Sequence, residues 1–219
     1  KNTYVVFMSD NGGRTRIPGA PSSEINRNAP LRDGKHSFYE GGIRVPFFVA
    51  GPGVEPGSVC NVPVSGVDLL PTFADLAGYS QPLPANIDGG SLRALLHNAG
   101  YGQVERPQPF LVFHQAVDRK PISAIRKGDF KLVKTWRPTG NRLELFDVSR
   151  DLSESKDRSG EMQGKTKELH NLLTNYLDGV GAALPKKDAP GGRKTKQRRK
   201  KKTDQQTETE SHPAEITDF

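Results

Sequence analysis

The chain has 219 residues, 33% of them hydrophobic, with a single cysteine and a formal net charge of +7. A chain of this length can bury the core of one domain with an appended subdomain. One cysteine excludes an intramolecular disulfide, and no apolar run is long enough to span a membrane as a helix. Eight basic side chains between residues 193 and 202 account for the charge, so the rest of the chain is close to neutral.

The first predicted element is a strand over residues 3–8, a continuous run of β-branched and aromatic residues. Such runs are typical of buried parallel strands, and open α/β sheets bind ligands just beyond the carboxyl ends of these strands. Asp10 and Asn11 occupy that position, and Gly12 and Gly13 after them allow a sharp turn. The two side chains offer the oxygens that Ca²⁺ or Mg²⁺ prefers, although Asp-Asn-Gly is also a common turn that bonds its own backbone.

A second candidate for a ligand-binding residue is Lys35, which follows Gly34 in the loop over residues 31–46. An ammonium on a flexible stem suits an oxygen of a sulfate or phosphate group. A lysine in such a loop is more often only solvated, so the residue type alone leaves both interpretations open. Glu40 and Arg44 are interpreted as a buried ion pair that fixes the loop.

Together these loops resemble the second half of a type I, formylglycine-dependent sulfatase of the arylsulfatase family. The resemblance rests on Ser-Asp-Asn-Gly-Gly at the start and on Leu-Arg-Asp-Gly-Lys-His-Ser-Phe-Tyr-Glu-Gly-Gly-Ile-Arg-Val-Pro-Phe after it. It extends through residues 49–54, 67–78 and 88–92 in the order that this family shows, and more faintly to about Leu184.

The resemblance implies an α/β fold: residues 1–105 would form part of an alkaline-phosphatase-like mixed sheet with helices, and residues 106–185 a small antiparallel-sheet-plus-helix C-terminal subdomain. It implies hydrolysis of a sulfate ester of an aryl or carbohydrate substrate, either a small molecule or a polysaccharide. It also implies that Asp10 and Asn11 complete a calcium site, Ca²⁺ being favoured over Mg²⁺, and that Lys35 contacts the sulfate as a catalytic and substrate-binding residue.

One feature of that family is missing from the 219 residues. Its nucleophile is a formylglycine made from the Cys of a Cys-x-Pro-x-Arg motif, which lies near the start of the full-length enzymes with the first calcium-binding aspartates. Cys60 is followed by Asn-Val-Pro and no arginine, so it is interpreted as a small apolar residue between two strands. We expect a fragment, inactive alone, whose formylglycine belongs to a missing N-terminal part. The resemblance favours a periplasmic or secreted location.

The middle of the chain predicts a short buried strand over residues 47–50 and a helix over residues 67–76 with Asp68 near its start. The apolar face of that helix, which includes Leu70 and Phe73, is assigned to the core. A short helix with Ser91 as its N-cap follows, and the Pro-rich residues 98–109 are expected to mark a domain boundary.

Four short apolar runs, at residues 110–114, 122–126, 130–134 and 143–147, are separated by turn signals and predict an antiparallel sheet. Lys131 and Lys134 indicate one solvent-exposed face, and a helix over about residues 165–177 is expected to cover the other. His114 ends the first run. It is interpreted either as a histidine held at a domain junction or, from the resemblance, as a substrate-binding residue.

Residues 186–219 form the last predicted unit, a disordered basic tail, because large apolar residues are almost absent from them. Their charge suits contact with a polyanion such as a sulfated polysaccharide. Nucleic acid is disfavoured, because no aromatic residues interleave the basic ones to stack on bases.

Two classes of function stay open. The first is a sulfuric ester hydrolase, with a phosphatase or phosphodiesterase of the alkaline-phosphatase superfamily as its variant. The second is a non-catalytic protein that keeps the fold and binds a polyanion through the tail. The Gly-Lys-His-Ser-Phe-Tyr-Glu-Gly-Gly loop favours a sulfatase.

Overall fold

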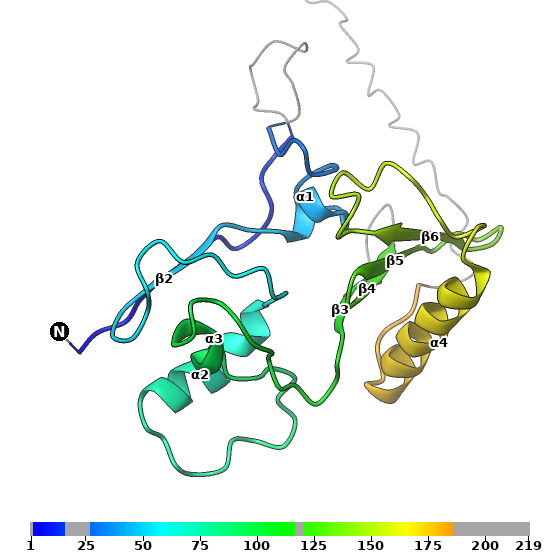
Figure 1. Cartoon of the computed structure of the whole chain (residues 1–219). Helices are drawn as coiled ribbons and strands as arrows, with labels where there is room; N and C mark the ends of the chain where they lie inside the picture. The colour runs from blue at the N-terminus through cyan, green and yellow to red at the C-terminus, as the bar shows by residue number, and fades with distance from the viewer. Residues whose placement is uncertain (1, 16–26, 117–120, 186–219) are drawn as a thin grey trace, which may run out of the picture. The chain divides into compact units, whose positions relative to one another are not determined.

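The computed structural model describes residues 2–15, 27–116 and 121–185 (Figure 1). The predicted basic tail, residues 186–219, lies outside the described residues. No helix in the described ranges is long and apolar enough to cross a membrane. The helices and strands are β1 (Val5–Met8), α1 (Glu40–Ile43), β2 (Phe47–Ala50), the 3-10 turn η1 (Gly66–Asp68), α2 (Leu69–Leu76), α3 (Arg93–Leu96), β3 (Leu111–Gln115), β4 (Ile122–Lys127), β5 (Phe130–Thr135), β6 (Arg142–Asp147) and α4 (Gln163–Gly179).

The first sheet is an antiparallel pair of β1 and β2, with Val5 opposite Ala50. Both segments are strands as predicted, but the first is not a buried parallel strand, and the prediction that the second is buried is also wrong. Phe7 is 57% exposed and Phe48 is 66% exposed. Within the described chain β1 has this single strand neighbour, and a two-stranded sheet cannot bury the side chains of a continuous apolar run on both faces.

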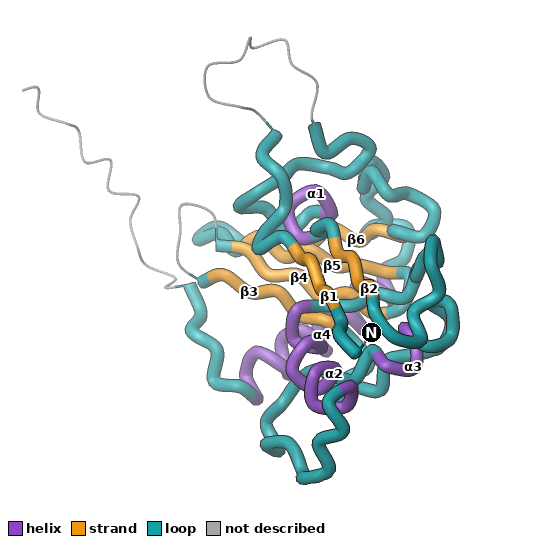
Figure 2. Tube along the Cα trace, turned by 90° about the vertical axis from the view of Figure 1, so that its left-hand side faces the viewer, coloured by secondary structure: helices purple, strands orange, loops and turns teal. Residues whose placement is uncertain are grey.

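The second sheet contains β3 to β6 in chain order, each antiparallel to the next (Figure 2). The prediction of four antiparallel strands is therefore confirmed. Short connections make sequential strands neighbours, and the tightest link, between β4 and β5, turns through Gly128 at a φ of +56°. Glycine adopts this left-handed conformation without a Cβ clash.

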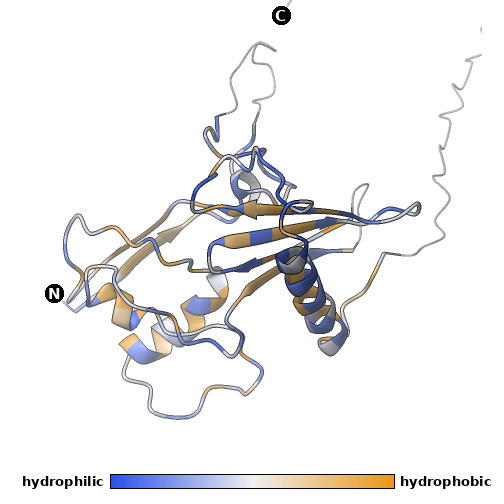
Figure 3. Cartoon of the chain, turned by 45° about the vertical axis from the view of Figure 1, so that its right-hand side comes forward, coloured by the Kyte–Doolittle hydropathy of each residue, from blue (hydrophilic) through white to orange (hydrophobic). Residues whose placement is uncertain are grey.

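One face of this second sheet packs against α4, which confirms the predicted helix and begins two residues before the expected start. Leucines four positions apart on α4 share one side of the helix, and the hydropathy colouring shows apolar and polar residues around it (Figure 3). Burial of these side chains drives the packing of the helix on the sheet. The buried residues of this cluster are Ile125, Leu132, Leu145, Leu169, Leu173 and Leu177.

The other face of the sheet is also covered, by Phe38 and Tyr39 from the segment before α1. The expectation of a solvent-exposed face is therefore wrong: Lys131 is 0% exposed and Lys134 is 4% exposed. Because the two lysines are three residues apart on β5, they project from opposite faces. Lys131 lies between two carboxylates, and the Lys134 ammonium lies 3.7 Å from the centre of the Trp136 ring.

The helix predicted over residues 67–76 is present as η1 and α2, but its apolar face is not core. Leu70 is 57% exposed and Phe73 is 46% exposed. The element is fixed by Asp68, which is 0% exposed and pairs with Arg106, Nη2 to Oδ2 at 2.6 Å. The predicted N-cap Ser91 lies one residue before the observed N-cap of α3, and its hydroxyl accepts a bond from the Arg93 N–H.

Cys60 is an exposed free thiol in the loop between β2 and η1, so its interpretation as an apolar residue between two strands is wrong. Prolines and glycines interrupt that loop and prevent a second strand. Residues 98–109 contain no helix or strand, and the domain boundary that we placed there stays a prediction.

Candidate functional site

Two loops that are separate in the sequence lie against each other, and they carry the residues singled out above. The Lys35 N–H donates to the Gly13 carbonyl at 2.9 Å, and the Gly12 N–H donates to the Gly42 carbonyl at 3.1 Å. The structure therefore brings the Asp10-Asn11 turn beside the Lys35 loop, although it does not by itself assign a role to either.

Glycines are required where these loops meet, for a reason that the sequence did not reveal. A Cβ on Gly12 would lie 2.2 Å from the Gly41 carbonyl oxygen, and a Cβ on Gly34 would lie 2.4 Å from that of Gly13. Neither Gly12 nor Gly34 has a left-handed φ. We expected a sharp turn to require glycine at position 12. Glycine is required there because two backbones approach each other closely.

Asn28 fastens the two loops together with its side chain. Its amide nitrogen donates to the Gly13 carbonyl at 2.8 Å and to the Asp33 carbonyl at 2.9 Å. The sequence analysis missed this residue, because an asparagine in a polar loop carries no periodic or motif signal. Its bonds connect the turn after Asp10 and Asn11 to the loop just before Lys35.

Lys35 lies between two residues in the left-handed conformation, Asp33 at a φ of 61° and His36 at a φ of 74°. Residues other than glycine seldom adopt this conformation, which costs free energy and persists where surrounding contacts fix the backbone. The Asp33 carboxylate accepts a bond from the Gly34 N–H at 3.0 Å, which stabilises its own turn. The backbone on both sides of Lys35 is therefore held in a conformation that it would not adopt alone.

The three side chains at the centre of this arrangement are unpaired within the described residues. Asp10, Asn11 and Lys35 are all at least partly exposed, and none of their side chains has a hydrogen-bond or ion-pair partner in the ranges that the structure describes. Neighbouring polar side chains such as Arg32 and Glu40 are bonded to other parts of the chain. The unpaired groups are available to a ligand.

The side-chain oxygens of Asp10 and Asn11 are the type of ligand that a hard cation prefers, but two residues supply too few of them. Ca²⁺ takes six to eight oxygen ligands. The described residues contain no group of three or more His, Cys, Asp or Glu side chains that could hold a metal ion. The described part of the chain therefore fits a portion of a calcium site, not a complete one.

His114 is not brought to these loops. Trp136 Nε1 donates to Ser123 Oγ at 2.7 Å, which leaves the serine hydroxyl to donate to His114 Nδ1 at 2.8 Å. His114 Nε2 then donates to the Ala183 carbonyl at 2.7 Å. Both ring nitrogens are engaged on the α4 side of the sheet, so a contact with substrate would require giving up one of these bonds.

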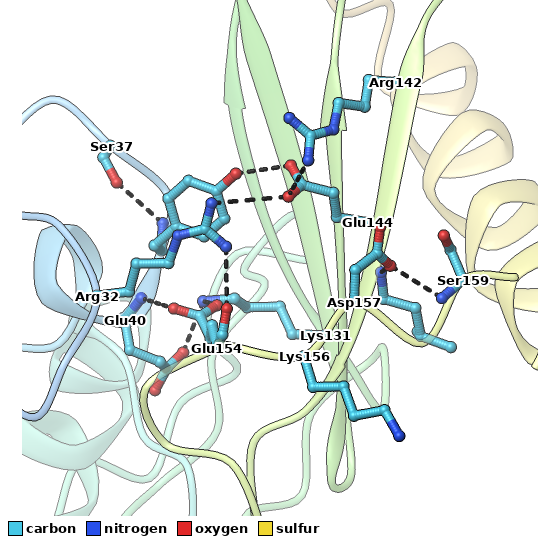
Figure 4. A network of polar contacts seen from close by, with 12 residues as sticks. Arg32, Ser37, Glu40, Lys131, Arg142, Glu144, Glu154, Lys156, Asp157 and Ser159 are labelled. Carbon is cyan, nitrogen blue, oxygen red and sulfur yellow. Dashed lines mark hydrogen bonds and ion pairs between the residues drawn. The ribbon is translucent and has the colours of Figure 1, made fainter. Parts of the chain in front are cut away.

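The Lys35 loop is tied to the second sheet by a buried charged network (Figure 4). Glu40 accepts a bond from Lys131 Nζ at 2.8 Å, and Lys131 Nζ lies 2.6 Å from Glu154 Oε1. The predicted Glu40–Arg44 pair is present at 3.4 Å, but Arg44 is 50% exposed, so the buried partner of Glu40 is Lys131. Strand β5 and the loop after β6 supply partners that no pattern within the loop itself could indicate.

Burial and charge act against each other in this network. Burial alone would raise the pKa of Glu40, but the Lys131 ammonium together with Arg126 and Arg44 outweighs it and holds that pKa below its usual range. Burial raises the pKa of the Glu154 carboxyl in spite of the same ammonium. The Tyr39 hydroxyl donates to Glu144 at 2.6 Å, and burial together with this carboxylate raises the pKa of Tyr39.

Comparison with known proteins places this arrangement in context. The sequence matches the family model described as Sulfatase over residues 1–79. A sulfatase of Formosa agariphila is 32% identical over 201 residues, which cover 88% of this chain and 34% of that protein. The choline-sulfatase of Rhizobium meliloti is 41% identical over 179 residues, which cover 81% of this chain and 30% of that protein.

Solved structures agree with the sequence relatives. One of them, a protein in complex with its substrate D-glucosamine-2-N,6-O-disulfate, matches with a TM-score of 0.59 at 25% identity, over 82% of this chain and 35% of that one. The chain thus spans about a third of the length of the relatives that it matches.

Proposed function

Because this chain belongs to the sulfatase family, with the α/β, alkaline-phosphatase-like fold that was predicted, we propose that the whole protein hydrolyses a sulfate ester. Water cleaves the ester to the free alcohol or phenol and inorganic sulfate. The observation that carries the proposal is the junction of two loops, bonded from the Lys35 N–H to the Gly13 carbonyl. These adjoining loops carry the side chains of Asp10, Asn11 and Lys35, which have no partner among the residues that the structure describes.

Lys35 is assigned to the sulfate group. Its ammonium places a fixed positive charge next to the oxygens on which negative charge grows as the ester bond breaks, and such preorganised charge lowers the barrier. The strained backbone at Asp33 and His36 supports this role, because it holds the base of the side chain in place before substrate arrives.

Asp10 and Asn11 are assigned to a Ca²⁺ ion, for which they supply oxygens but too few of them. When bound, the ion polarises a sulfate oxygen as a Lewis acid. Further ligands, and a formylglycine nucleophile, are assigned to the part of the protein that this chain does not span, since the 219 residues contain no Cys-x-Pro-x-Arg motif.

For the substrate, a sulfated saccharide is favoured over a simple aryl sulfate. A structural neighbour of 25% identity was solved with a disulfated glucosamine as its substrate, and that neighbour covers 82% of this chain. The basic residues between 193 and 202 would raise the local concentration of such a polyanion, and less so as salt screens them.

The test is steady-state hydrolysis of an aryl sulfate, as a general probe, by the full-length protein. Removing one preorganised stabilising group typically lowers turnover by about 10² to 10³, so Lys35→Ala is expected to fall by that factor. The matched control is Lys156→Ala, which removes a lysine that is 60% exposed and paired with Glu161. Lys35→Ala with the activity of the wild type would refute the assignment.

Calcium is tested separately by titrating the chelator-treated full-length protein with CaCl₂ and following activity. Asp10→Ala is expected to shift the half-activating Ca²⁺ concentration upward by about tenfold or more, because a ligand oxygen is lost. Asp75→Ala, which removes a surface carboxylate paired with Arg93, serves as the control. An unchanged Ca²⁺ requirement in Asp10→Ala would remove Asp10 from the metal site.

A further inference from the structure

Glu154 fastens the Lys35 loop at both of its ends. Arg32 Nη1 donates to the Glu154 carbonyl oxygen at 2.9 Å, and the Glu40 N–H donates to the Glu154 carboxylate at 2.6 Å. These two contacts bridge 122 and 114 positions in the sequence. Lys35 lies between the two anchor points in the sequence, and Glu154 itself is 0% exposed.

The carboxylate of Glu154 can be buried there because Lys131 neutralises it. Lys131 is 0% exposed and lies 2.6 Å from Glu154 and 2.8 Å from Glu40, while Arg126 lies 3.8 Å from Glu40. Two buried carboxylates without these cations would carry a large desolvation cost and repel each other. The charges therefore balance around the point where the loop is held.

The contacts of Glu154 are directed at the loop, not at the apolar packing of the sheet. Apart from the Lys131 ammonium on β5, the acceptor groups of Glu154 meet a guanidinium and a backbone N–H, and both of these donors belong to the loop. Arg32 also stacks on Tyr39, its Cζ 3.7 Å from the ring centre. Directional bonds of this kind fix where a backbone lies, whereas apolar contacts of similar area tolerate sliding.

We propose that Glu154 is a positioning residue for catalysis, which sets the place of Lys35 by holding Arg32 and Glu40 at the two ends of its loop. This inference rests on the proposed sulfate-ester hydrolysis. The physical reason is preorganisation: a loop already fixed in its working geometry spends no substrate-binding energy on becoming ordered. The left-handed Asp33 and His36, between the same anchors, are where a released loop would relax first.

The test is a double-mutant cycle on the full-length protein with an aryl sulfate as the probe. Glu154→Gln retains the size of the side chain and the backbone carbonyl that Arg32 contacts, but it removes the charge that pairs with Lys131 and fixes the carboxylate against the Glu40 N–H. We expect this change to lower kcat/KM by about tenfold or more. In the Lys35→Ala background the same change is expected to cause no further loss, because the group that Glu154 positions is already gone. Glu168→Gln, on the exposed side of α4, is the matched control and should leave both backgrounds unchanged.

A merely structural role predicts a different result. If Glu154→Gln only reduced the amount of folded protein, its loss would be the same factor with and without Lys35, and such additivity would overturn the proposal. The folded fraction of each variant is measured by circular dichroism. If Glu154→Gln does not fold, Arg32→Lys removes the bond to the Glu154 carbonyl from a residue that is 35% exposed, and the same cycle applies.

The two proposals fail in distinguishable ways. Wild-type activity in Lys35→Ala would overturn the proposed function and this inference together. A large loss in Lys35→Ala combined with additive losses from Glu154→Gln or Arg32→Lys would overturn the positioning role alone.

Discussion

The two regions of the described chain bury their apolar side chains to very different extents. In residues 121–185 the core is complete, with side chains such as Ile125 and Leu169 at 0% exposure. In residues 2–15 and 27–105 the buried large apolar side chains are Leu92 and Leu95, while Val5 is 64% exposed and Leu70 is 57% exposed. The site loops belong to this second, poorly buried region.

The difference shows what holds the site in place. The N-terminal region relies on directional polar bonds and on backbones that touch: the close approach at Gly12, the bonds of Asn28 and the buried Asp68. Part of its apolar packing comes from the other region, because Phe38 packs on the cluster around Val133. Site geometry is therefore set by hydrogen bonds and ion pairs, and apolar burial stabilises the sheet that anchors them.

The largest effect is expected from breaking the buried ion pair of the N-terminal region. Asp68→Ala leaves the Arg106 guanidinium buried without its partner, and removing one member of such a pair costs about 3–5 kcal/mol. Asp75→Ala breaks an exposed Asp–Arg pair with Arg93 and should cost at most about 1 kcal/mol. Urea unfolding of the 219-residue chain measures both, and equal costs would show that burial of the pair does not hold this region.

The next largest effect on the free energy of unfolding is expected from replacing a leucine with alanine, and this change can be compared between the two regions. Leu169→Ala removes a side chain that is 0% exposed and is expected to cost about 2–5 kcal/mol. Leu70→Ala makes the same change where the leucine is 57% exposed, and it should stay within about 0.5 kcal/mol. Urea unfolding measures both costs in free energy. If Leu70→Ala cost nearly as much as Leu169→Ala, the two regions would not differ in apolar burial as described.

The smallest effect concerns the turn that leads into Glu154. Burial alone would raise the pKa of Asp151, but the Lys156 N–H and the hydroxyls of Ser153 and Ser155 outweigh it and lower that pKa from 3.8 to about 2. A lowered carboxyl pKa contributes stability above about pH 4 that is lost as the pH falls toward 2. The melting temperature of Asp151→Asn should therefore lie below that of the wild type at pH 5 and approach it near pH 2. A difference of the same size at both pH values would argue against these bonds.

The sequence predicted the elements of the C-terminal region well, because four apolar runs joined by short turns and a helix with leucines four positions apart are local patterns. It also singled out Asp10, Asn11 and Lys35, through a family resemblance, and the structure brings their loops together. It failed where the answer depends on distant partners. Lys131 has the pattern of a solvent-facing residue, and only the carboxylates of Glu40 and Glu154 explain its burial.

The same limit applies to the apolar run of β1 and to the exposed face of α2. Residue types fix which segments form a strand or a helix, but exposure depends on what packs against them. The sequence could not predict why Gly12 must be glycine, nor the bonds of Asn28, because both come from the contact between two loops that are separate in the sequence.

We propose that the Asp10-Asn11 and Lys35 loops form part of a site for sulfate esters. The most direct measurement is kcat/KM of the full-length protein for the sulfate ester and for the phosphate ester of the same phenol, in the wild type and in Lys35→Ala. We expect the sulfate ester to be the better substrate of the wild type, and we expect kcat/KM for that ester to fall by about 10² to 10³ in Lys35→Ala, so that its advantage over the phosphate ester is lost. A preference for the phosphate ester, or hydrolysis of neither, would contradict it.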